Sequence, residues 1–268
     1  MDLRGLSGPA RAELSFLASR VPEVFEVNEA RKVLNLPNAR VTQKLASWTK
    51  SGYLSRIKRG TYIQIPMNIE NPMNWFGDDF RVAISFWPNS YFTGWTAANH
   101  WGLTEQVFRT VVVKTSDRVR SNGNKGLREK FMTIHVAKLD TSWGINTEWR
   151  DGYKISYADP ARTIAEILAQ PELGGGIRLV VEMLDTYLHD YEATDLVNAV
   201  TRLNKGTACK RLGYLLEVLN FSDHKTLEYL ALKVTKGITL LDPAGGDSGE
   251  RKMRWNLRIN ANVERSNS

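Results

Sequence analysis

Positively charged side chains gather in one short part of this sequence, and their chemistry is the binding of anions. Between residues 30 and 69 there are eight Lys and Arg and no Asp or Glu. Residues 1–65 carry 11 Lys and Arg against 5 Asp and Glu, whereas residues 66–268 carry 25 against 24. Ammonium and guanidinium groups hold phosphates, so this segment predicts a polyanionic partner such as a nucleic acid. A solvated cationic face is the simpler alternative.

Three aspartates are the best candidates for acid–base chemistry. Asp78 and Asp79 lie in a segment with nine aromatic residues between positions 73 and 103, and Asp159 precedes a helix-like segment. A carboxylate that activates water beside stacked rings is what a base-flipping DNA glycosylase needs. The alternatives are a solvated turn for the first two and a helix cap for the third, with the rings in the core. No known catalytic motif occurs, so we assign no catalytic residue.

Metal-binding and redox chemistry have little support. Cys209 is the only cysteine, so it cannot form a disulfide within the chain and is expected to be buried. The glycines at 174–176 lack the lysine and hydroxyl residue of a phosphate loop and predict a plain loop. We therefore expect no metal and no cofactor. The histidines lack zinc-ligand spacing; they are His100, His135, His189 and His224.

The elements that carry the cationic side chains predict a winged helix. Apolar spacing indicates a helix over residues 9–19, a short second helix capped by Asn28, and a third helix that starts at the cap Asn38 and ends before Gly52. The second and third helices are separated by a few residues around Pro37, as a helix-turn-helix requires. The third helix then presents a polar and cationic face opposite its apolar one.

A basic hairpin follows the third helix. Two β-rich runs, residues 53–57 and 61–65, flank a tight turn that contains Gly60. A helix of this length fits the major groove of DNA, and a basic hairpin contacts neighbouring phosphates or the minor groove. Double-stranded DNA is therefore the expected partner. The candidate contacts are Asn38, Arg40, Thr42, Gln43, Lys44, Lys50, Arg56, Lys58 and Arg59.

The rest of the chain predicts a second, larger domain. The polar, turn-rich segment 68–79 separates a domain over residues 1–67 from one over residues 80–268. Four amphipathic helices are expected between residues 177 and 234, after a small mixed region. The fold class is thus α+β, with an N-terminal winged helix-turn-helix and a mixed α/β, mostly helical C-terminal part. The mixed region is predicted to contain a helix at 93–101, strands at 107–114, 131–136 and 153–157, and a helix to Leu168, with strand-like alternation at 253–260.

The composition and the length of the apolar runs predict that no helix of the chain spans a membrane. The chain is 42% hydrophobic and 24% charged, which is typical of a globular protein. No apolar run approaches the roughly 20 residues of a membrane-spanning helix, and the first residues lack the apolar core of a secretory signal. We expect no membrane partner and a cytoplasmic location.

Several segments together resemble the AbiEi family of antitoxins from type IV abortive-infection toxin–antitoxin systems. They are GYLSRIKRGTYIQI, SYFTGWTAANHWGLTEQ, ADPARTIAEIL and KRLGYLLEVL, and their order covers most of the chain. The resemblance implies an N-terminal winged helix that represses its own operon and a C-terminal domain that neutralises a nucleotidyltransferase-like toxin. It implies no catalytic residue. It assigns DNA contacts to Arg40, Thr42, Lys44, Arg56, Lys58 and Arg59.

Three functional hypotheses follow from the sequence. The first is a DNA-binding antitoxin and transcriptional autorepressor of a phage-defence operon. The second is a phage-defence enzyme acting on DNA, such as a glycosylase that excises modified bases after flipping them. The third is an ordinary transcription regulator with a ligand-sensing C-terminal domain.

Overall fold

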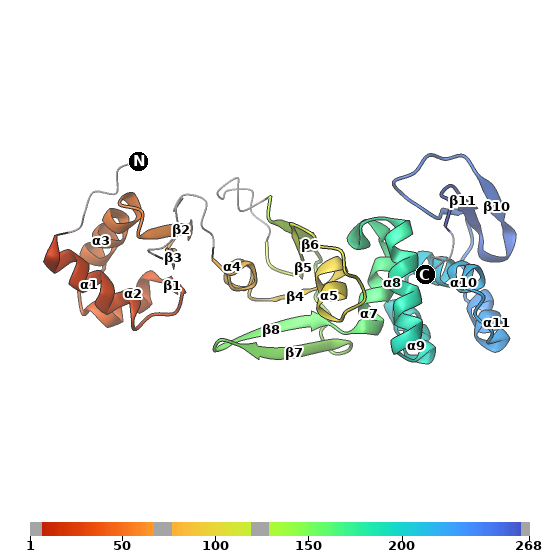
Figure 1. Cartoon of the computed structure of the whole chain (residues 1–268), viewed down its shortest axis with the longest axis horizontal. Coiled ribbons are helices and arrows are strands. Elements are labelled where there is room, and N and C mark those ends of the chain that lie inside the picture. Colours follow the sequence, from red (N-terminus) through yellow and green to blue (C-terminus); the bar gives the residue numbers. More distant parts are fainter. Residues whose placement is uncertain (1–6, 67–76, 119–128, 264–268) are drawn as a thin grey trace. The chain divides into compact units, whose positions relative to one another are not determined.

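The computed structural model describes residues 7–66, 77–118 and 129–263, which form helices and three β-sheets (Figure 1). This mixture confirms the α+β class. The chain divides into two compact units, Met1–Asn89 with Ser116–His135, and Ser90–Thr115 with Val136–Ser268. Most of the predicted linker, residues 68–76, lies outside the described residues, and the domain limits 1–67 and 80–268 stay a prediction.

The first unit begins with three helices and a small sheet. The strands are antiparallel in the order β1-β3-β2. Their apolar side chains and those of the helices form one core, with Phe25 and Trp48 among its largest members. The predicted helices and hairpin strands are confirmed to within one or two residues. The elements are α1 (Gly8–Ala18), β1 (Val24–Glu26), α2 (Val27–Leu34), α3 (Asn38–Lys50), β2 (Leu54–Lys58) and β3 (Thr61–Gln64).

Both predicted helix caps in this unit are wrong. Helix α2 begins at Val27, and a capping box closes its start because Glu26 and Glu29 each bind the other's backbone N–H. The reciprocal pair satisfies two amides, whereas Asn28 lies inside the helix. Helix α3 begins at Asn38 itself after Pro37, whose fixed φ suits the position before a helix. Asn38 is therefore a helical residue with an exposed side chain.

The turn between β2 and β3 directs basic side chains outward. Gly60 has φ +81°, a conformation that costs glycine little and other residues more. The pairing of the two strands shifts register between Arg56 and Lys58, and such a bulge increases the local twist. Ile57 and the first three residues of β3 are buried, whereas Arg56 and Arg59 are exposed.

Helix α4 (Asp79–Phe86) and strand β6 (Phe131–His135) also belong to the first unit. Strand β6 confirms the strand predicted at 131–136. Trp87, which ends α4, packs its ring edge-on against Phe131 with centroids 5.5 Å apart. This aromatic contact buries both rings and joins the two elements.

The second unit contains a mostly antiparallel sheet. Its strands β4 (Ser90–Phe92), β5 (Val111–Thr115), β7 (Ile145–Arg150) and β8 (Tyr153–Ala158) have the order β5-β4-β8-β7, and only the β4–β8 pair is parallel. The predicted strand at 107–114 is too long, because residues 105–110 are irregular and Val107 is 91% exposed. Strand β7 was not predicted from the sequence. Its side chains are mostly exposed, so it lacks the alternation that marks a half-buried strand.

Helix α7 (Pro160–Ala169) is the central element of this unit. It packs against α5 (Gly94–His100), α8 (Ile177–Asp190), α9 (Ala193–Leu203) and α10 (Gly206–Val218). Asp159 caps its start, as predicted, and a buried arginine closes its end. Arg211 donates to the carbonyl oxygens of Leu168 and Ala169, which have no partner within the helix. Burial lowers the pKa of Arg211 to about 10, so it still carries its charge at neutral pH.

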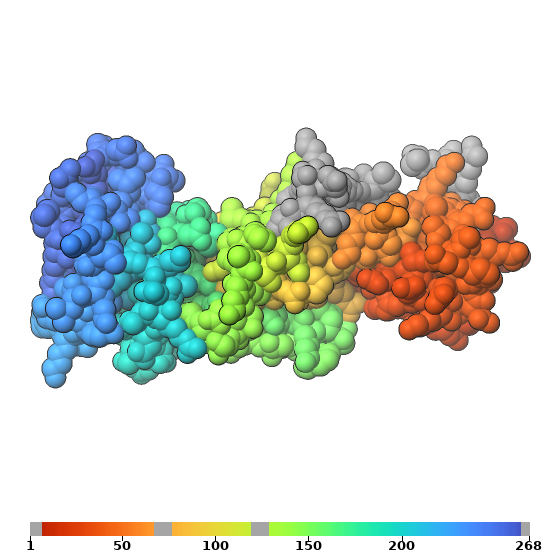
Figure 2. Space-filling view, turned by 180° about the vertical axis from the view of Figure 1, so that it is seen from behind, coloured from red at the N-terminus to blue at the C-terminus, as the bar shows by residue number. Residues whose placement is uncertain are grey.

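The four predicted C-terminal helices are confirmed as α8, α9, α10 and α11 (His224–Leu232). A small sheet of β9 (Thr239–Leu240), β10 (Glu250–Lys252) and β11 (Leu257–Ile259) follows, with a short 3₁₀ helix at Met253–Trp255. The segment predicted as a strand at 253–260 is therefore extended only in its second half. In Figure 2 the dark blue end of the chain lies against the lighter blue α10 and α11.

Trp255 joins this sheet to α10. Its indole is fully buried, and its Nε1 donates to Glu217 at 2.8 Å. The ring passes so close to Gly213 of α10 that a Cβ there would overlap it. A glycine in mid-helix costs up to about 1 kcal/mol against alanine, so its presence here is explained by the close approach of the ring.

We predict that Gly213→Ala destabilises the fold by about 1–3 kcal/mol, because the indole must shift to admit the methyl group. Gly246→Ala is the matched control, since a Cβ at Gly246 meets nothing within 4 Å. Urea unfolding followed by circular dichroism measures both variants. Equal stability of the two would contradict the packing described for Trp255.

Candidate functional site

The exposed face of α3 is set by the residues that the helix buries. Val41, Leu45 and Trp48 point into the core and fix the rotation of the helix about its axis. The opposite side then carries polar and basic groups in solvent. Its predicted site residues Asn38, Arg40, Thr42, Gln43 and Lys50 are all exposed. No residue of α3 carries a negative charge.

A groove of about 510 Å³ runs between α3 and the β2–β3 hairpin. It brings together Asn38 and Thr42 from the helix with Arg56, Lys58 and Arg59 from the hairpin, and Glu26 at the end of β1 also lines it. Arg40, Gln43, Lys44 and Lys50 do not line it, because they lie further round the helix. The predicted residues thus form two adjoining surfaces rather than one.

A second hollow lies at the turn between α2 and α3. Arg31, Lys32, Asn35, Leu36 and Pro37 line its volume of about 420 Å³. Both cations belong to the basic segment seen in the sequence, but neither was among the predicted contacts. The run of positive charge in the sequence marks Arg31 and Lys32 as candidate contacts. Their position beside α3 depends on the turn at Asn35, which has φ +51°.

Two of the predicted cations are engaged inside the unit. Lys44 forms an ion pair with Glu13 of α1, with 2.6 Å between Nζ and Oε2. Lys58 is half-buried, donates to the backbone carbonyl oxygen of Ser85 in α4, and lies over the ring of Phe86. These two ammonium groups already have partners. Arg56 and Arg59 are exposed, and within the described part of the chain only the Nε of Arg56 is engaged, by donating to the Lys58 carbonyl oxygen at 3.4 Å, so these guanidinium groups are better placed to bind an outside anion.

The three candidate catalytic aspartates all bind groups of the fold. Asp78 caps α4 by accepting from the Phe80 N–H at 2.8 Å, and Asp79 pairs with Lys130 at 2.7 Å. Asp159 accepts from the Arg162 N–H at 2.7 Å. The cap alternative is therefore confirmed for Asp159. For Asp78 and Asp79 the solvated turn is replaced by a helix start with an ion pair.

The aromatic residues near position 90 form core rather than an open stacking platform. Tyr91, Phe92 and Trp95 are buried, and Trp95 stacks on Phe108 with ring centroids 4.6 Å apart. Its Nε1 also donates to the Thr110 carbonyl at 2.6 Å. Trp75 and Phe76 lie outside the described residues. The described rings are thus held by packing and hydrogen bonds.

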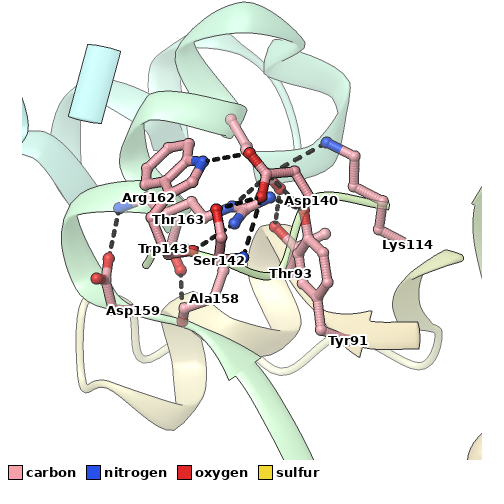
Figure 3. A network of polar contacts seen from close by, with 11 residues as sticks. Tyr91, Thr93, Lys114, Asp140, Ser142, Trp143, Ala158, Asp159, Arg162 and Thr163 are labelled. Carbon is pink, nitrogen blue, oxygen red and sulfur yellow. Dashed lines mark hydrogen bonds and ion pairs between the residues drawn. The ribbon is translucent and has the colours of Figure 1, made fainter. Parts of the chain in front are cut away.

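The second unit holds a buried charged cluster in which Tyr91, Thr93, Lys114 and Arg162 gather (Figure 3), and all four bind the carboxylate of Glu166. This carboxylate is 2% exposed and accepts from the hydroxyls of Tyr91 and Thr93, at 2.6 and 2.7 Å. Lys114 and Arg162 bind it at 3.1 and 3.0 Å. Burial alone would raise the pKa of Glu166, but the two cations and the two hydroxyls lower it below its ordinary value.

Arg162 extends this cluster toward the surface. Its guanidinium lies between the rings of Tyr91 and Trp143, and it donates to the Tyr91 hydroxyl and the Trp143 carbonyl oxygen. Burial and the neighbouring Glu166 raise the pKa of Tyr91, so its phenol stays protonated and keeps donating. The groups of this cluster satisfy one another. We therefore assign it a structural role in joining β4, β5 and α7.

Within the described ranges, no group of three or more His, Cys, Asp and Glu side chains is placed to hold a metal ion. The same residues include no helix that is both long and apolar enough to cross a membrane. Cys209 is buried as predicted, and burial raises the pKa of its thiol.

The chain shares its fold with a protein of known structure. It is similar to the RV2827C protein from Mycobacterium tuberculosis, whose crystal structure matches with a TM-score of 0.68 over 96% of this chain and 92% of that one. The two sequences are 16% identical, so the likeness concerns the fold alone. No protein-family model and no curated protein matches the sequence.

We predict that Glu166→Gln destabilises the protein by about 3–5 kcal/mol at neutral pH, because Lys114 and Arg162 lose their buried counter-charge. The lowered pKa of Glu166 gives a stabilisation that is present above its unfolded pKa of about 4.3 and is lost as pH falls through the folded value. The difference in the free energy of unfolding between the wild type and the variant should therefore become smaller in acid.

Urea unfolding between neutral pH and the acid range measures this difference. Glu182→Gln, on an exposed position of α8, is the matched control and should change stability by less than about 0.5 kcal/mol. If the Glu166→Gln protein is as stable as the control, the negative charge of Glu166 contributes nothing to folding stability.

Proposed function

We propose that the protein is a DNA-binding antitoxin and autorepressor whose residues 7–66 act as a winged helix. The observation that carries the proposal is the acid-free exposed face of α3 beside the groove that Arg56, Lys58 and Arg59 line. The element order α1-β1-α2-α3-β2-β3 with an antiparallel sheet supports the winged-helix part of the proposal.

Each part of the surface has a role in this proposal. Helix α3 spans about 20 Å at 1.5 Å per residue, and its width suits the major groove. The hairpin contacts the flanking backbone through Arg56 and Arg59, which are exposed. Arg31 and Lys32 line the hollow at the turn between α2 and α3, where they would bind phosphates. Phosphate contacts of this kind position the protein without reading sequence.

The antitoxin part of the proposal depends on the resemblance to AbiEi antitoxins. In this proposal, the second unit neutralises a nucleotidyltransferase-like toxin in the cytoplasm, and the first unit represses transcription. The Glu166 cluster supports a stably folded second unit without supplying a reactive group. Asp78, Asp79 and Asp159 each bind a neighbouring group in the fold, so no observation favours the glycosylase alternative.

We predict that replacing Arg56 and Arg59 together by Ala weakens binding to the DNA upstream of the protein's own gene. The slope of log affinity against log salt should become shallower by about two, because two phosphate contacts are lost. Fluorescence anisotropy across a salt series measures it. Arg178→Ala, at an exposed position of α8, is the control.

The same double variant separates the two proposed activities. Growth rescue on co-expression with the toxin encoded by the adjacent gene should be unchanged, because rescue is assigned to the second unit. Unaltered DNA binding by the double variant would refute the assignment of the hairpin. Failure of the wild type to rescue growth would refute the antitoxin role and leave DNA binding standing.

We predict that Glu13→Gln strengthens DNA binding, most of all at low salt. The substitution releases Lys44 from its ion pair and removes a negative charge from the helix beside α3, so the salt slope should steepen by about 0.9. Folding stability should change by less than about 1 kcal/mol, because the pair is partly exposed. Glu105→Gln, also exposed, is the control. Weaker binding by Glu13→Gln would show that the pair positions α3 for DNA instead of competing with it.

A further inference from the structure

The outermost stripe of α3 combines one amide, two alanines and a lysine in the last turn. Ala39, Gln43, Ala46 and Lys50 follow each other at spacings of four, three and four residues, which places them on one line along the helix. All four are exposed. Ala39 and Ala46 lie about 10 Å apart along the axis at 1.5 Å per residue, and this length spans about three base-pair steps of 3.4 Å.

Gln43 has the longest side chain at the centre of this stripe. Among the described residues its amide takes part in no side-chain hydrogen bond or ion pair, whereas the hydroxyl of Thr42 donates to the carbonyl of Asn38 at 2.9 Å. The alanines one turn before and after it leave room on both sides. A surface in front of the helix can therefore come close enough for the amide to reach it.

The cationic neighbours of Gln43 lie either on one flank of the helix or at its end. Lys44 points to α1, where Glu13 holds it, and Arg40 lies on that same flank, roughly 60° round the helix from Gln43 at 100° per residue. Lys50 is at the last turn, well beyond the alanines. Arg40 and Lys44 on the flank and Lys50 at the end of the helix suit phosphates at the rim of a groove better than base edges at its floor.

We infer that Gln43 is the base-reading residue of the proposed DNA surface and that it selects an adenine within an A·T-rich core of the site. The inference rests on the proposed function. A glutamine amide presents a donor and an acceptor together, which match the adenine N7 and N6 amino group in the major groove. The methyl groups of Ala39 and Ala46 suit contact with thymine methyl groups in adjacent pairs.

Selection from a random pool of duplexes with the purified full-length chain tests the inference. The wild type should enrich a site with adenine at one position, preferred about 5- to 100-fold over other bases. Gln43→Ala should abolish the preference at that position and keep the others. Gln43→Glu should shift it toward cytosine, because a carboxylate accepts from the cytosine amino group.

Two matched variants complete the experiment. Lys50→Ala, on the same stripe, and Arg40→Ala, on the flank, should weaken binding and flatten the salt dependence while the enriched sequence stays the same. Circular dichroism checks that all variants keep their helix content.

The outcomes distinguish the base-reading role of Gln43 from DNA binding itself. An enriched sequence that is unchanged in Gln43→Ala, or one that changes in Arg40→Ala instead, overturns the assignment to Gln43 and leaves DNA binding intact. Enrichment of a site without any adenine preference at the Gln43-dependent position overturns the predicted base. A wild-type protein that binds no duplex even at low salt overturns the proposed function, and this inference with it.

Discussion

The rotation of α3 about its axis is the constraint on which the cationic surface depends. Val41, Leu45 and Trp48 are buried in one core with α1, α2 and the sheet, and burying such side chains contributes about 1.5–3 kcal/mol each. No other rotation of the helix buries all three. The polar residues between them are consequently forced outward in a fixed order, with small side chains at the most prominent positions. The packing of α3 alone therefore orients the side chains on which the proposed function depends.

The same core also determines which charges are available. A count of the basic residues in the sequence treats the eight cations between positions 30 and 69 as equal. The fold distinguishes them, because Lys44 meets Glu13 of the neighbouring helix and Lys58 meets the end of α4. The guanidinium groups of the hairpin remain exposed. The positive charge that is available to an outside anion is therefore carried by fewer groups than the sequence suggests, because Glu13 of α1 pairs with one of them.

Local signals in the sequence were sufficient for elements whose stability is local or periodic. Helices such as α3 and α8 were found from apolar spacing, and the Asp159 cap from its residue type before a proline. The Asn28 cap failed because Glu26 and Glu29 form a reciprocal pair that outcompetes a single amide. Strand β7 escaped notice because an edge strand with exposed side chains has no apolar alternation. Its position depends on pairing with β8.

Contacts between distant residues were beyond prediction from the sequence. Glu166 meets Tyr91 and Thr93 across more than 70 residues of chain, and nothing near any of them in the sequence marks the group as buried. The candidate DNA surface lies at the other extreme, since its residues fall within one helix and one hairpin. The two regions differ because a buried charge must gather partners from several elements, whereas a reading surface needs side chains that the fold leaves unoccupied. Gln43 satisfies that condition because the core takes the apolar side of its helix and α1 takes Lys44.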